Sequence, residues 1–195
     1  SPDRVQREGS ELFFTSTHST NPLLFTHLFK AVVDTSLTDG VRLPASLVLE
    51  AVIKKISKEN KPLLEICHEN CLEALSRSPS KAVSKTLASA YFHYLDHVSA
   101  LSKSDVQLVV PVYSQFFEKL EPETDPTRIY YLLVGYLRIN KIFEVFLPNE
   151  QKTQLHEKIF TRLETLLEKL KEPSCAVLRP SFYRIIAKIF FVSYR

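Results

Sequence analysis

Apolar residues recur at helical spacing along most of the chain after residue 21. The segment that starts at Glu150 shows the pattern best, because its leucines and isoleucine fall three or four positions apart while lysine, arginine and glutamate occupy the other faces. Such a helix buries one face and leaves the opposite face in water. The same spacing predicts helices at residues 22–37, 44–58, 62–77, 80–98, 105–120, 126–146, 150–171 and 175–194.

Prolines stand at most of these predicted boundaries. Proline fixes its own φ and has no N–H to donate, so it suits the first turn of a helix. Asp125 followed by Pro126 is the clearest start, because the aspartate can accept N–H groups of that turn. Pro44 is also expected to open a helix, whereas Pro111 falls inside the helix predicted at 105–120 and is expected to bend it.

Residues 1–21 lack the helical pattern. They are mostly polar, with a short apolar cluster at residues 12–14, and residues 15–20 are rich in serine and threonine. We therefore expect a loosely ordered lead-in over residues 1–21 and a helical domain over residues 22–195. Because the chain lacks an initial methionine and stops directly after an apolar run, we expect it to be a piece of a longer protein.

The composition supports an all-α fold. Only three glycines accompany eleven prolines, which argues against sandwiches, barrels and glycine-loop nucleotide folds. Three cysteines are too few for a disulfide scaffold and indicate an intracellular, reducing compartment, either the nucleus or the cytoplasm. No run of about 18 apolar residues occurs, so no membrane contact is expected. The net charge of +3 is too small to require a polyanionic partner.

A repeat connects three of the predicted helix starts. Residues 79–83 and 173–177 agree at four of five positions and lie 94 residues apart. Pro126 stands halfway between them, again followed by a hydroxyl residue, so the period is 47 residues. Two-helix repeats of about 40–47 residues are typical of HEAT and armadillo arrays.

The chain resembles the HEAT family in one further place. Residues 109–112 place a proline within a predicted helix, and a turn then leads to an aspartate and an arginine within residues 125–128. This order is similar to the HEAT pattern of a kinked first helix followed by a second helix that starts near Asp and Arg. The resemblance covers about residues 62–195 and implies a right-handed α-solenoid of HEAT-like helical hairpins, with an irregular helical bundle as the alternative. Three positions interrupt the family pattern: Lys81, Cys175 and Pro180.

Two clusters contain side chains that can bind zinc. They comprise Cys67, His68 and Cys71 in one predicted helix and His93, Asp96 and His97 in the next. Cysteine also acts as a small apolar core residue, and the glutamate that separates the two histidines in zinc proteases is absent here. We therefore interpret both clusters as structural.

No catalytic, cofactor-binding or metal site is predicted. With glycine only at positions 9, 40 and 135, the chain can build neither a Gly-x-Ser-x-Gly elbow nor a phosphate-binding loop. We therefore expect a protein without enzymatic activity and without a cofactor.

Two basic clusters support an alternative role in nucleic-acid binding. Such a surface would gain affinity from phosphate contacts and from bases stacked on aromatic rings, for which Tyr130, Tyr131 and Tyr136 are candidates. Tyrosines at helical spacing are, however, more typical of a core edge. The basic candidates are Lys54, Lys55, Lys58 and Lys61 near one predicted helix end, and Arg179, Arg184 and Lys188 near the end of the chain.

An acidic cluster precedes Pro126. It consists of Glu118, Glu121, Glu123 and Asp125. The cluster is either a solvated loop whose charges favour the start of the following helix, or part of a ridge that binds a peptide of mixed charge.

We expect the chain to serve as a non-catalytic scaffold that binds a protein partner within a larger complex. Stacked two-helix repeats leave a ridge of second-helix residues available for recognition. Residues 182–194 are apolar on nearly all sides, which predicts either a docking surface for a further repeat or partner, or a central core helix. The candidate partner-binding residues on the ridge are Lys81, Lys85, Arg128, Arg138 and Lys141.

Overall fold

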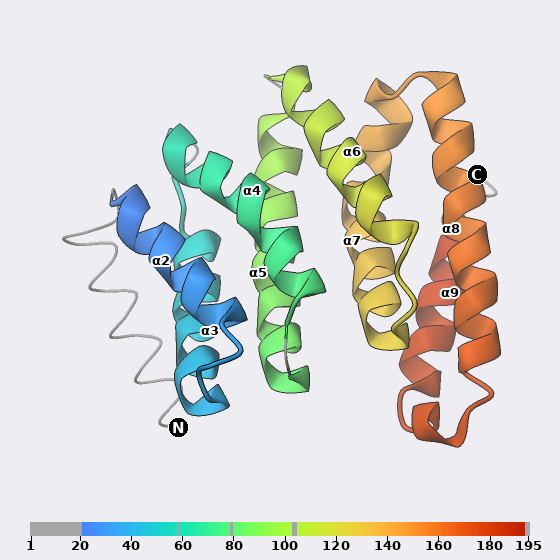
Figure 1. Ribbon diagram of the computed structural model, residues 1–195. Coiled ribbons are helices and arrows are strands. Elements are labelled where there is room, and N and C mark those ends of the chain that lie inside the picture. Colours follow the sequence, from blue (N-terminus) through green and yellow to red (C-terminus); the bar gives the residue numbers. More distant parts are fainter. Residues whose placement is uncertain (1–20, 58, 79, 103–104, 194–195) are drawn as a thin grey trace. The chain divides into compact units, whose positions relative to one another are not determined.

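The computed structural model describes residues 21–57, 59–78, 80–102 and 105–193 (Figure 1). Within these ranges every regular element is a helix, which confirms the predicted all-α class. The α-helices are α2 (Pro22–Val33), α3 (Asp39–Lys54), α4 (Lys61–Ser76), α5 (Lys81–Leu101), α6 (Val109–Leu120), α7 (Pro126–Phe146), α8 (Asn149–Lys169) and α9 (Arg179–Ser193). Two 3-10 helices, η1 (Val106–Leu108) and η2 (Pro173–Cys175), precede α6 and α9. The predicted lead-in lies outside the described residues except for Asn21.

Side-chain caps begin three of the helices, each followed by a proline in the first turn. The Asn21 side chain accepts a hydrogen bond from the Leu24 N–H at 3.2 Å at the start of α2. Asp125 accepts one from the Arg128 N–H at 2.9 Å at the start of α7. Asn60 caps α4 in the same way. Because the first N–H groups of a helix have no partner within it, these caps set the helix starts.

Pro44 does not open a helix, so this part of the sequence prediction is wrong. Helix α3 already begins at Asp39, and Pro44 lies inside it. The Thr38 carbonyl accepts the N–H groups of Val41 and Arg42 at 3.0 Å each, and the Asp39 carboxylate pairs with the Arg42 guanidinium at 2.8 Å. These local bonds start the helix upstream of the proline, which removes one backbone hydrogen bond from its middle.

Pro111 and Pro180 also behave differently from the prediction. Pro111 is the third residue of α6, where an N–H would have no partner within the helix, so it does not interrupt a helix interior. Pro180 is the second residue of α9 and therefore helps to begin that helix rather than interrupting a repeat. Of the three starts that the repeat relates, Pro126 opens α7, Pro173 opens only η2, and Pro79 lies outside the described residues.

The helices form two compact units, of which unit 1 ends at His97 and unit 2 begins at Val98, both within α5. In unit 1, α2 packs against α3 and α4. Two polar contacts join α5 to α3: the Ser89 hydroxyl donates to the Glu50 carboxylate at 2.7 Å, and His97 Nε2 lies 2.6 Å from the Ile53 carbonyl oxygen. The helices of unit 1 are therefore held together by an apolar core and by specific hydrogen bonds between side chains and neighbouring helices.

In unit 2, α7 packs against α6, α8 and α9. Phe143 of α7 meets Tyr113 edge to face at 5.8 Å between ring centroids, and Phe116 lies 6.4 Å away. On another side of α7, Tyr130 lies 4.9 Å from Phe182 of α9. Aromatic contacts of this kind contribute beyond the area they bury, so α7 is the centre of this unit.

Helices α6 and α8 pack against each other and run in the same direction. Near their starts, the Tyr113 hydroxyl donates to the Gln151 carbonyl at 3.5 Å. Further along, the Lys158 ammonium lies 5.9 Å from the centroid of the Phe117 ring. The hairpin formed by α8 and α9 is thus stacked in parallel on the hairpin formed by α6 and α7.

Replacing the cap of α7 tests how much the turn before this helix contributes to stability. We expect Asp125→Ala to lower the free energy of unfolding by about 1 kcal/mol, because the first-turn N–H group of Arg128 loses its acceptor. Asp125→Asn retains an acceptor and is expected to stay close to the original protein. Urea denaturation followed by circular dichroism measures the difference, with the exposed Glu118→Ala as control. Equal losses for the alanine and asparagine variants would contradict the capping role.

Candidate functional site

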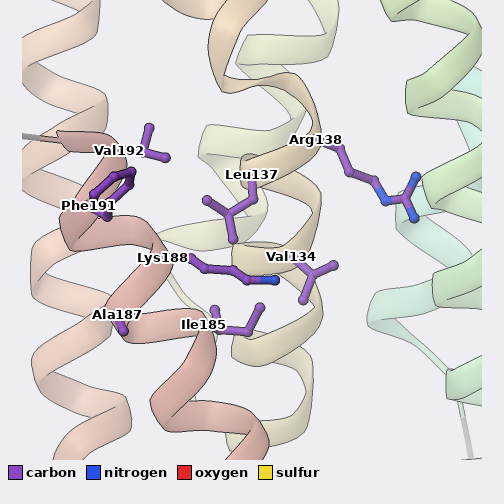
Figure 2. Close-up of a pocket in the computed structure, with 8 residues that line it drawn as sticks. All are labelled: Val134, Leu137, Arg138, Ile185, Ala187, Lys188, Phe191 and Val192. Carbon is purple, nitrogen blue, oxygen red and sulfur yellow. The ribbon is translucent and has the colours of Figure 1, made fainter. Parts of the chain in front are cut away.

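Helices α7 and α9 of unit 2 enclose a groove of about 690 Å³, the α7–α9 groove. The two helices run in the same direction, since Tyr130 contacts Phe182 near their starts and the groove is lined further along both helices. Figure 2 shows the side chains that face it. The lining residues are Val134, Leu137 and Arg138 from α7, and Ile185, Ala187, Lys188, Phe191 and Val192 from α9.

The lining is mostly apolar, with two cations at its edge. The Lys188 side chain extends from α9 toward α7 (Figure 2). Arg138 extends from α7 away from α9. Phe191 is 65% exposed, and Tyr183, farther back on α9, is 53% exposed. Exposed aromatic and aliphatic groups beside long cationic side chains are a composition common in protein-binding surfaces.

Two further cations lie one helical turn from Arg138 and Lys188. Lys141 follows Arg138 by three positions on α7, and Arg184 precedes Lys188 by four on α9. All four are exposed, and Lys141, Arg184 and Lys188 form no hydrogen bond or ion pair with the residues that the structure describes. The sequence of α9 contains no acidic residue. The surroundings of the groove are therefore positively charged.

The groove brings together residues that sequence reasoning assigned to two different roles. Arg138 was predicted on the partner-binding ridge, and Lys188 in the C-terminal basic cluster. The apolar lining from α9 belongs to residues 182–194, predicted as either a docking surface or a core helix. The lining from α7 was not predicted, because Val134 and Leu137 fit the core pattern of a helix equally well. The 47-residue repeat was the one signal that pointed to neighbouring second helices.

Arg128, also predicted on the ridge, is engaged in the turn between α6 and α7. Its guanidinium donates to the Glu123 carboxylate at 3.0 Å. The same carboxylate accepts the N–H groups of Thr124 and Asp125, and the Glu123 carbonyl accepts a bond from Arg162 of α8 at 3.0 Å. A partner would have to displace these internal bonds to reach Arg128.

Most of the acidic cluster serves the same turn. Glu123 holds Arg128, Asp125 caps α7, and Glu121 forms an ion pair with Lys158 of α8. Glu118 alone of the four makes neither a side-chain hydrogen bond nor an ion pair with described residues. Asp125 therefore favours the start of α7, as the loop interpretation predicted, while Glu123 and Glu121 connect this turn to α7 and α8. The interpretation as a binding ridge stays a prediction.

Arg179, predicted in the C-terminal basic cluster, caps the end of α8. Its Nε donates to the Leu170 carbonyl at 2.6 Å, and its Nη2 donates to the carbonyls of Lys171 and Glu172 at 3.3 and 3.0 Å. The last carbonyls of a helix lack partners within it, and a cation there also meets the negative end of the helix dipole. Arg179 is thus a structural residue, unlike Arg184 and Lys188.

The remaining predicted basic residues belong to unit 1. Lys81 and Lys85 are exposed on α5, and Lys54 is the last residue of α3. Lys55 caps that helix end and Lys61 begins α4, both exposed as predicted. Lys58 lies outside the described residues. These lysines flank the connection between α3 and α4 or the start of α5.

The first potential zinc cluster is built into the core. Cys67 and Cys71 are buried, and burial raises the pKa of the Cys71 thiol. His68 points elsewhere, with Nδ1 3.0 Å from the Tyr94 hydroxyl. In the second cluster, His97 bonds to the Ile53 carbonyl. Nowhere among the described residues do three histidine, cysteine or acidic side chains gather around one point.

The tyrosines of α7 contribute to packing. Tyr136 is buried, and burial raises its pKa to about 12. Tyr130 lies against both Tyr131 and Phe182. These contacts agree with a core edge and leave few faces on which a base could stack.

No helix of the described ranges combines the length and apolar composition needed to cross a bilayer. No family model, curated protein or solved structure matches the chain. The HEAT-like resemblance therefore stays a prediction, and the function rests on the chemistry of the site.

The different roles of the two C-terminal arginines can be separated by mutation. We expect Arg179→Ala to lower the free energy of unfolding by about 1–2 kcal/mol, because three carbonyls lose a charged donor. Arg184→Ala, on the exposed face of the same helix, is expected to change it by less than about 0.5 kcal/mol. Thermal and urea unfolding measure both. A larger loss for Arg184→Ala would contradict this assignment.

His68 predicts a pH dependence of stability. Burial lowers its pKa below the ordinary value of 6.5, an effect that the nearby Glu69 charge partly opposes. Between that value and the lower native one, the unfolded chain binds a proton that the native protein does not, so the free energy of unfolding falls as the pH drops below about 7. We expect His68→Gln to weaken this fall, measured by urea denaturation at several pH values. His27→Gln, at an exposed site on α2, serves as control and is expected to leave the dependence unchanged.

Proposed function

We propose that this chain is a HEAT-like helical-repeat module that binds a protein partner through the α7–α9 groove and carries out no chemistry of its own. The parallel stacking of the α6–α7 and α8–α9 hairpins supports this proposal, because repeat arrays stack their hairpins in this way. In such arrays the second helices form the recognition face, and α7 and α9 are the second helices here. The module would form part of a larger intracellular assembly.

The observation that carries the proposal is the composition of the groove. Its lining places Val134, Leu137, Phe191 and Val192 beside one another on two adjacent helices, with Lys188 among them. Apolar surface gains free energy when a partner removes it from water, and cations at its rim select the partner by charge. A partner protein can supply both complements.

Nucleic-acid binding, the alternative, has less support. One of the basic residues nominated for it, Arg179, is occupied within the protein. Tyr130 and Tyr136, two of the candidate stacking residues, pack inside unit 2. Phosphate groups bind to cations and need no apolar surface, so nucleic-acid binding does not account for the apolar lining of the groove.

Filling the groove tests the proposed function. Ala187 lines it and is exposed, so Ala187→Arg would obstruct the groove while retaining its positive charge and a good helix former. The matched control is Ala82→Arg, the same substitution at an exposed position of α5. We expect proteins captured from cell extract by the original chain and by the control to be lost with Ala187→Arg.

The capture is repeated at high salt and after nuclease treatment. We expect the partner set to survive both treatments, because an apolar contact does not depend on phosphate or on low salt. Loss of all partners with nuclease would favour the nucleic-acid alternative. A partner set that Ala187→Arg leaves intact would show that the groove is not the binding site.

A further inference from the structure

We infer that the occupant of the α7–α9 groove is an amphipathic helix of another protein whose polar face is acidic. This inference rests on the proposed function and names the chemistry of the partner. It follows from the shape of the groove, from the charges around it, and from what those charges exclude.

The shape suits a helix laid along two parallel helices. From Arg184 to Val192, the stretch of α9 beside the groove covers about 12 Å, which corresponds to about two helical turns. A partner helix of that length presents apolar side chains at positions i, i+3 or i+4, and i+7 on one face. The apolar lining between α7 and α9 can receive these side chains in a row.

The charges determine what surrounds that apolar stripe. Lys188 lines the groove from α9 and Arg138 lines it from α7. The exposed Arg184 lies one turn before Lys188, and the exposed Lys141 lies one turn after Arg138. Glu144, which lies one turn after Lys141, is engaged with α8, since its carboxylate lies 3.0 Å from His156 Nε2 and accepts a hydrogen bond when that nitrogen carries a proton. A helix docked in the groove therefore meets Lys188 and the neighbouring Arg184 along α9, which form no ion pair with described residues and favour glutamate or aspartate beside its apolar stripe.

The same charges disfavour a second copy of this chain as the occupant. A two-fold symmetric contact places each surface patch against its own copy. Arg184 and Lys188 of one molecule would then approach the same cations of the other, with no acidic residue on α9 to offset them. Like charges brought together in this way oppose association.

A pair of synthetic peptides tests the charge of the partner directly. Both have about 16 residues and carry leucine at i, i+3, i+4 and i+7; one has glutamate on its polar face and the other has lysine at the same positions. Fluorescence anisotropy measures their binding to the full chain. We expect the glutamate peptide to bind at least about tenfold more tightly than the lysine peptide.

Three variants connect that preference to the groove. The double change Arg184→Glu with Lys188→Glu is expected to reverse the preference in favour of the lysine peptide. Ala187→Arg, which keeps the positive charge, is expected to weaken the glutamate peptide by about tenfold or more through steric obstruction. Lys152→Glu on α8 makes one such charge reversal outside the groove lining and is expected to leave the preference unchanged.

Several results would overturn the inference. They are equal affinities for the two peptides, a preference for the lysine peptide, no binding of either at about 1 mM, and binding that Ala187→Arg does not affect. Self-association in sedimentation experiments that Ala187→Arg abolishes would assign the groove to a second copy instead. Binding to vesicles of anionic lipid, lost with the double charge reversal, would assign it to a membrane surface.

The experiments distinguish failure of this inference from failure of the proposed function. If the peptides show no acidic preference while Ala187→Arg still abolishes the capture of proteins, the groove binds a protein of different chemistry. If Ala187→Arg leaves the captured proteins unchanged, the proposed function itself fails.

Discussion

Unit 2 depends on the need of α7 to bury apolar side chains on more than one side. A helix can remove an apolar face from water only by packing against a neighbour. Phe143 is covered by aromatic rings of α6, and Tyr130 is covered by Phe182 of α9. Cover by α9 is incomplete, because the α7–α9 groove remains between the two helices. The candidate site is therefore a direct result of how the central helix is packed.

The cationic residues of unit 2 form two groups with different roles. Arg128 and Arg179 satisfy carboxylate or carbonyl groups at helix ends, where unpaired backbone groups would otherwise remain. Arg184 and Lys188 stay at the surface and make no such bond with described residues. Only the second group can meet a partner without loss of internal bonds. Net charge alone hides this division, because all four residues count equally in the sum.

Much of the local structure could be predicted from the sequence. The Asp125–Pro126 start of α7 was correct because cap and proline are adjacent and act within one turn. The prediction that Pro44 opens a helix was wrong, because bonds from Thr38 and Asp39 start α3 before the proline is reached. Proline is compatible with a helix start, but it does not require one. Its neighbours decide whether the helix has already begun.

By itself, the sequence determined the all-α class, most helices and the Asp125 cap of α7, since apolar spacing and first-turn chemistry act over a few residues. Tertiary structure alone decided that Arg138 and Lys188 border one groove while Arg128 and Arg179 serve helix ends. Helical periodicity shows which face of a helix is apolar, but it does not show which neighbour covers that face or how completely. That information resides in contacts between residues some fifty positions apart, such as Tyr130 and Phe182.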